Sequence, residues 1–127
     1  MISSQSLSRN ISRYEIACNC GCGFDTIDIK TVQTIQEVCD HIAESKGIDK
    51  VIVHFNSGCR CFAWNDHEGG SEDSQHLYGR AVDFWIEDVD PALVYEYLNR
   101  KYHGMYGIGS YKNFTHFDSR SGDPARW

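Results

Sequence analysis

The sequence predicts a small single domain of the α+β class, with helices flanking a central antiparallel sheet. The chain has 127 residues, which is the length of one domain. Its segments follow one another as helix, strand, loop, strand, helix and strands, without a repeat or linker in residues 1–127. We expect residues 1–12 to be loosely ordered, because Ser and Asn are frequent there.

The first half of the chain predicts one helix. Apolar side chains recur at helical spacing over roughly residues 28–45, at Val32, Ile35, Cys39 and Ile42. Asp25 or Asp28 is a suitable cap for its start, and Gly47 is a suitable end.

A short strand and a long loop follow this helix. The β-branched run Val51–Phe55 predicts the strand. Residues 56–75 are polar and rich in glycine, so we expect a loop, and a loop of this length inside a small domain is often functional.

The second half predicts strand, helix and two further strands. Residues 81–86 are mostly apolar and predict a strand. Asp90 followed by Pro91 is typical of a helix start, and an apolar stripe continues to Tyr102. Glycines then surround a short strand near residues 107–109, and residues 114–120 predict the last strand.

Charge and hydropathy exclude two classes of partner. The net charge is −6, whereas nucleic-acid binding usually needs a basic surface, so we expect no nucleic acid. No apolar run approaches the ~18 residues of a membrane helix, so we expect no membrane insertion. No signal peptide is visible at Met1–Asn10, and we expect the protein to be made in the cytoplasm.

Three residues in the second half suggest a metal site on the sheet. Asp83 lies in the middle of an apolar strand, where a carboxylate is costly to bury unless it is paired or binds a metal. His116 lies in a similar setting between Phe114 and Phe117, and His76 ends the polar loop. Two histidines and a carboxylate suit a catalytic zinc ion, which keeps its fourth position for water. The alternative is a surface His76 and a hydrogen-bonded His116 in the sheet.

Four segments resemble the zinc D-Ala-D-Ala carboxypeptidase family of peptidoglycan peptidases. Residues 74–83 show the pattern S-x-H-x-x-G-x-A-x-D of its first zinc motif. Residues 57–60 resemble its S-G-x-R segment, and Asn65 with Gly69-Gly70 resembles its N…GG loop. Residues 107–109 and 115–120 resemble its closing G-I-G and H-x-D-x-R strand. The resemblance spans roughly residues 13–120.

The resemblance implies a role for each of these positions. His76, Asp83 and His116 would bind zinc. Arg60 would face the scissile carbonyl or the substrate carboxylate, and Ser74 would help to hold the substrate. For Ser74, a hydroxyl bonded only to the nearby backbone is an equally good interpretation.

The general base is where the sequence departs from the family pattern. Relatives place Glu, Asp or His two or three residues before the last zinc histidine, and here Asn113 and Phe114 stand there. Asp118 is the first candidate, because it shares a strand face with His116. In a second interpretation His116 is the base and Asp118 the third ligand, and in a third the site binds metal without efficient cleavage.

The cysteines suggest a second metal. Cys18, Cys20 and Cys22 form a C-x-C-G-C run, and Cys59 and Cys61 flank Arg60. Zinc held between the run and this loop would help to fix Arg60. Disulfides are the alternative if the protein works outside the cytoplasm.

The resemblance therefore implies a zinc peptidase that cuts a peptide bond next to a D-amino acid in peptidoglycan peptides. Its small size resembles the short lysis proteins of phages and prophages, which act at the cell wall after release. The alternative is a zinc-containing module that binds a wall peptide without cleaving it.

Overall fold

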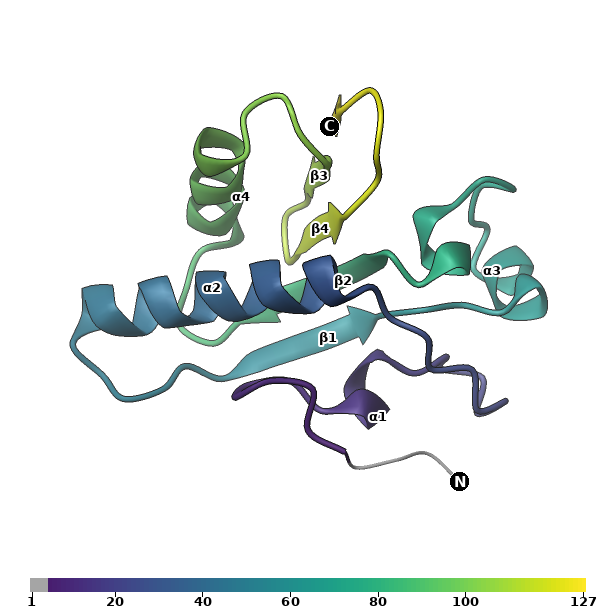
Figure 1. The fold of residues 1–127 in the computed structure, drawn as a ribbon, viewed down its shortest axis with the longest axis horizontal. Helices are drawn as coiled ribbons and strands as arrows, with labels where there is room; N and C mark the ends of the chain where they lie inside the picture. Colours follow the sequence, from purple (N-terminus) through teal and green to yellow (C-terminus); the bar gives the residue numbers. More distant parts are fainter. Residues whose placement is uncertain (1–4) are drawn as a thin grey trace.

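The computed structural model describes residues 5–127, and in that range it has helices around a five-stranded sheet (Figure 1). The helices are α1 (Arg13–Ile16), α2 (Ile29–Lys46), α3 (Phe62–His67), α4 (Pro91–Lys101) and the short 3-10 helix η1 (Gln75–Tyr78). The strands are β1 (Val53–Ser57), β2 (Ala81–Ile86), β3 (Gly107–Ser110), β4 (Thr115–Asp118) and β5 (Ala125–Arg126). The predicted α+β class is confirmed.

The sheet has the strand order β1-β2-β4-β3-β5. The first four strands pair antiparallel, as predicted. The two-residue strand β5 pairs parallel to β3, so the whole sheet is mixed. Arg126 anchors this added strand, because its guanidinium donates to the carbonyls of Tyr102, Met105 and Tyr106.

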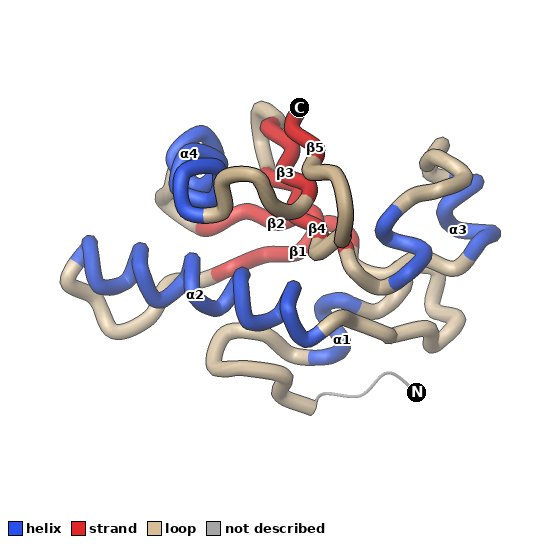
Figure 2. The backbone as a smooth tube through the Cα atoms, turned by 45° about the horizontal axis from the view of Figure 1, so that its top comes forward, coloured by secondary structure: helices blue, strands red, loops and turns tan. Residues whose placement is uncertain are grey.

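The two faces of the sheet differ in chemistry. Side chains alternate along each strand, so Val82 and Phe84 of β2 and Phe117 of β4 point into one apolar core. Helices α2 and α4 contribute to the same core, and Figures 1 and 2 show α2 lying along β1 and β2. Asp83 and His116 therefore lie on the opposite face, which is not covered by the two long helices.

Side-chain caps fix the ends of both long helices. The Asp28 carboxylate accepts from the Lys30 backbone N–H at the start of α2, and Gly47 ends that helix with φ 67°. The Asp90 carboxylate accepts from the Ala92 N–H at the start of α4, where Pro91 is the first helical residue. Both helices begin within a residue of the predicted position.

The sequence predicted the region between β1 and β2 less well. Strand β1 begins at Val53, two residues later than predicted, and Ile52 is 57% exposed. The predicted loop over residues 56–75 contains helix α3. The sequence of α3 shows no apolar stripe at helical spacing, and its first residue, Phe62, is 81% exposed.

The residues before α1 pack against the body of the domain from residue 5 onward. Ile11 is buried in the core, and the Asn10 side chain donates to the Val51 carbonyl. Residues 5–12, which we expected to be loosely ordered, are thus held by specific contacts, and residues 1–4 of that prediction lie outside the described range. No helix within residues 5–127 is long and apolar enough to cross a membrane.

Candidate metal centre

Asp83 and His116 are brought together by the pairing of β2 with β4. They are direct partners in the antiparallel register. The His116 Nδ1 atom lies 2.8 Å from Asp83 Oδ1, and both side chains are largely buried. Their contact follows from strand alternation, which places both on the face opposite the core.

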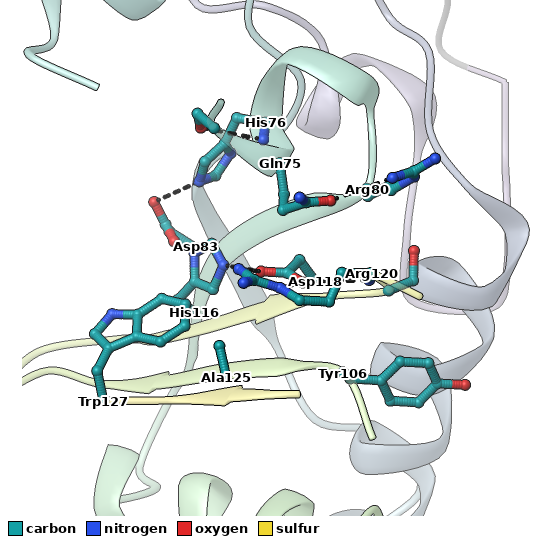
Figure 3. Close-up of polar contacts among 12 residues, drawn as sticks. Gln75, His76, Arg80, Asp83, Tyr106, His116, Asp118, Arg120, Ala125 and Trp127 are labelled. Atoms are coloured by element: carbon teal, nitrogen blue, oxygen red, sulfur yellow. Dashed lines mark hydrogen bonds and ion pairs between the residues drawn. The ribbon is translucent and has the colours of Figure 1, made fainter. Parts of the chain in front are cut away.

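His76 reaches this pair from η1. The Ser74 hydroxyl caps that helix by accepting from the His76 backbone N–H at 3.2 Å. The His76 side chain is 5% exposed, and its Nδ1 donates to the Gly58 carbonyl oxygen at 2.6 Å. The other ring nitrogen, Nε2, lies 3.3 Å from Asp83 Oδ2. Figure 3 shows His76, Asp83 and His116 facing one another.

These three residues fit a zinc ion. One potential ligand atom from each lies within 4.8 Å of the other two. Two nitrogens and one carboxylate oxygen form a usual catalytic zinc set, which leaves a position for water or substrate. The Gly58 carbonyl orients His76 in the manner typical of zinc-binding histidines.

Asp118 orients His116 in the same manner. Its Oδ2 atom lies 2.7 Å from His116 Nε2, and Arg120 binds both of its oxygens at 2.7 Å (Figure 3). Asp118 is 0% exposed. This enclosure favours a role for Asp118 in fixing the His116 ring, and the prediction that Asp118 is the general base stays a prediction. The cluster whose ligand atoms lie close together contains His116, and the alternative with Asp118 as third ligand also stays a prediction.

The pKa values of Asp83 and His116 are shifted by their contacts with each other and with neighbouring side chains. Burial would raise the pKa of Asp83, but hydrogen bonds with His116 and His76 hold it well below its usual range. Burial lowers the pKa of His116, but hydrogen bonds with Asp118 and Asp83 outweigh burial and raise it. Without metal, the His116 imidazolium is thus favoured between two carboxylates, and a metal must displace its Nδ1 proton.

His76, Asp83 and His116 line a cavity of about 570 Å³. Loops before β2 and after β3, together with β4 and the end of the chain, line it: Arg60, Gly70, Ser71, Asp73, Ser74, Gln75, His76, Asp83, Tyr111, Phe114, His116, Arg120 and Trp127. The predicted residues Arg60 and Ser74 therefore lie on the same cavity as His76, Asp83 and His116. His54 and His103 are not among its lining residues.

Hydrogen bonds hold the Arg60 side chain in place beside Asp83. Its Nε donates to Ser57 Oγ at 3.1 Å and its Nη1 to Asn65 Oδ1 at 3.3 Å. Its Nη2 lies 3.7 Å from Asp83 Oδ2, and the side chain is 13% exposed. The amide of Asn65 is itself fixed by the Ser71 carbonyl. The guanidinium is thus aimed at the cavity and does not behave as a solvated surface cation.

Trp127 and Tyr111 form a wall that the sequence did not predict. The Trp127 ring lies 4.9 Å from the His116 ring, and its indole N–H donates to the Tyr111 hydroxyl at 2.8 Å. A Cβ at Gly109 would approach Trp127 Nε1 to 2.5 Å, so this glycine leaves room for the indole. Gly109 in the short strand was the one sequence signal of this contact. Its partner Trp127 lies 18 residues further along the chain, so the sequence did not connect the two.

Four of the five predicted cysteines meet at a second place. Cys18, Cys20, Cys22 and Cys61 have their sulfurs within 4.8 Å of one another. Cys59 is not part of this group: its side chain is buried, and its thiol donates to the Phe24 carbonyl at 3.0 Å.

A buried His, Asp and His set that opens into a cavity beside a fixed arginine is the kind of site found in zinc hydrolases. The family model for peptidase M15 matches residues 9–118. The chain therefore belongs to the M15 peptidases, a zinc-dependent family of the D-Ala-D-Ala carboxypeptidase type. The search of curated proteins finds no match. The family match contains the three clustered residues and Arg60, and it ends before Trp127.

Proposed function

We propose that this protein is a zinc peptidase that hydrolyses a peptide bond next to a D-amino acid in bacterial peptidoglycan peptides. The observation that carries the proposal is the His76, Asp83 and His116 cluster, which opens into the same cavity as Arg60. Family membership supports a metallopeptidase. A role at the cell wall after release, as in phage lysis proteins, rests on the family resemblance alone.

His76, Asp83 and His116 would hold the zinc. Zinc, when bound there, supplies a Lewis acid that polarises a carbonyl and lowers the pKa of a water molecule to about 7. Asp118 keeps the His116 ring in the orientation that presents Nδ1 to the site. The Gly58 carbonyl does the same for His76 Nε2.

Arg60 stabilises negative charge on the substrate. Ser57 and Asn65 hold two of its nitrogens, so the guanidinium is already placed before substrate arrives. A preorganised donor of this kind stabilises the oxyanion that develops at the scissile carbonyl, or binds a terminal carboxylate. Ser74 lines the same cavity, and its hydroxyl hydrogen is free to donate to substrate while its oxygen caps η1.

Asp73 is the residue to which we assign proton transfer. Among the described residues that line the cavity, it is the only carboxylate besides Asp83. It is exposed, so water reaches its carboxylate. This assignment replaces Asp118, which is enclosed by His116 and Arg120.

A binding module is the second candidate function. Asn113 and Phe114, which stand where relatives of the family carry a proton acceptor, favour it. In that case the same cavity would hold a wall peptide by Arg60 and the metal, without turnover.

The test uses zinc-loaded protein and purified peptidoglycan fragments, both linear peptides ending in D-Ala-D-Ala and cross-linked peptides. Release of new amino groups, with products identified by mass spectrometry, supports the peptidase if chelator abolishes it and zinc restores it. His76→Ala should abolish release. His54→Ala is the matched control, because His54 pairs with Glu87 outside the cavity. Calorimetric binding without release would instead support the module, and neither binding nor release would refute both.

A further inference from the structure

Four cysteines from two distant segments converge on one point of the surface. Cys18, Cys20 and Cys22 lie in the turn after α1, and Cys61 immediately precedes α3. The Cys18 and Cys20 sulfurs are 3.4 Å apart, and each lies within 3.8 Å of the Cys61 sulfur. We infer that this cluster is a second zinc site with four thiolate ligands, separate from the His76, Asp83 and His116 site.

The sulfur spacing matches a tetrahedral zinc ion. Zinc–sulfur bonds of about 2.3 Å place tetrahedral ligands about 3.8 Å apart. The distances among the Cys18, Cys20 and Cys61 sulfurs, 3.4, 3.7 and 3.8 Å, are close to that value. A disulfide needs sulfurs about 2.05 Å apart. All six cysteines are free thiols, so no pair within the cluster is already bonded.

Backbone N–H groups point at two of the four sulfurs. The Cys61 N–H points to the Cys18 sulfur at 3.5 Å, and the Trp64 N–H points to the Cys61 sulfur at 3.4 Å. Hydrogen bonds to sulfur stabilise its charged form, which is the form that binds metal. Cys59 differs, because its sulfur donates to a carbonyl and therefore keeps its proton.

The cluster joins two segments that touch closely. The Cys59 N–H donates to the Ile16 carbonyl at 2.9 Å. A Cβ at Gly58 would approach that carbonyl oxygen to 2.2 Å, so only glycine permits the contact. Thiolate zinc at this point would close the chain over 43 residues, from Cys18 to Cys61.

A zinc ion with four protein ligands has no open position, so this site is structural. Because Cys61 follows Arg60 directly, zinc bound here would hold the backbone next to Arg60 in place. The loop that it closes also carries the Gly58 carbonyl that orients His76. Cys20 and Cys22 are exposed, which gives metal and chelator access.

The experiment counts zinc by elemental analysis in protein purified under reducing conditions. We expect two zinc ions per chain in the unaltered protein and one in His76→Ala. The double variant Cys20→Ser with Cys22→Ser should also retain one. Cys59→Ala is the matched control and should retain two, since Cys59 lies outside the cluster.

Cobalt substitution gives a second readout that is independent of activity. Thiolate-to-cobalt charge-transfer absorption should appear in the unaltered protein and in His76→Ala and Cys59→Ala, and should be lost in the double variant. If the double variant does not fold, the absorption in His76→Ala alone decides the matter. Absence of that absorption would overturn the second site and leave the peptidase proposal untouched.

Discussion

Asp118 lies directly behind His116, with its Oδ2 atom 2.7 Å from the imidazole Nε2 and no exposed surface of its own. The other ring nitrogen of His116 faces Asp83. The pair therefore has the form of a carboxylate that orients a metal-binding histidine. Loss of the Asp118 carboxylate should therefore lower the affinity for metal, whereas loss of a general base would lower only the rate of hydrolysis.

Asp118→Asn should weaken zinc binding by about 10- to 100-fold, the usual effect of losing such a partner. Competition with a chelator of known affinity measures the change. If Asp118 were the base, the variant would bind zinc normally and lose only turnover. Unchanged zinc affinity would therefore contradict the orienting role.

Asp73→Asn should leave zinc content intact and lower the rate of hydrolysis by roughly 10²- to 10⁴-fold, the range for loss of a general base. The measurement is kcat on the fragment that the unaltered protein cleaves best.

Glu72→Gln is the control for Asp73→Asn, because Glu72 is the adjacent acidic residue and does not line the cavity of the metal group. Its rate should be unchanged. Equal effects of both substitutions would indicate that acidic charge on the loop matters and that Asp73 has no special role.

Zinc and protons should compete at His116. Contacts with Asp118 and Asp83 raise the pKa of His116 in the metal-free protein, although burial opposes the rise. A raised pKa in the folded state means that the imidazolium stabilises the fold below the ordinary value of about 6.5. This contribution is lost as pH rises through the folded pKa.

The stabilisation by zinc should accordingly increase with pH. In the double variant Cys20→Ser with Cys22→Ser, which lacks the proposed thiolate site, we expect the difference in Tm between zinc-loaded and chelated protein to grow between about pH 6 and about pH 8, as the His116 imidazolium loses its proton. His116→Asn should remove most of this dependence. A difference in Tm that is constant with pH would show that His116 does not exchange a proton for metal.

Trp127→Ala should raise KM by roughly 2- to 10-fold with little effect on kcat, since an aromatic contact is worth about 0.5–1.5 kcal/mol. The indole forms a wall of the cavity beside His116. Gly109→Val should act in the same direction, because a side chain there displaces the indole. The assay is steady-state kinetics on a cleaved fragment.

Trp85→Ala is the control for this wall. Trp85 stacks on His54 and does not line the cavity, so KM should be unaffected even if stability falls. A change in kcat alone for Trp127→Ala would place the indole in the chemical step and would contradict its role as a binding wall.

The sequence predicted those parts of the molecule that depend on local pattern. Helix α2 was found from its apolar spacing and its caps, and Asp83 stood out because it interrupts an apolar strand. Alternation correctly placed Asp118 on the same strand face as His116. It could not show that Arg120 encloses Asp118, because depth depends on how loops fold over the strand.

Contacts between distant segments account for the remaining differences. Cys59 and Cys61 are equivalent in the sequence, but pairing of the Cys59 backbone with Ile16 turns one sulfur into the interior and leaves the other at the cluster. Strand β5 has only two residues and is held by Arg126, so it has no periodic pattern to detect. Trp127 owes its place in the cavity to this strand.

The direct pairing of Asp83 with His116 also protects the chain against misfolding. A slip of one residue between β2 and β4 would turn one strand over. Phe84 or Phe117 would then face the cavity, and a carboxylate or an imidazole would enter the apolar core. Such an arrangement is costly before any metal arrives. Burial of Phe84 and Phe117 in the core therefore favours the register that aligns Asp83 with His116, so the geometry of the site depends on residues outside it.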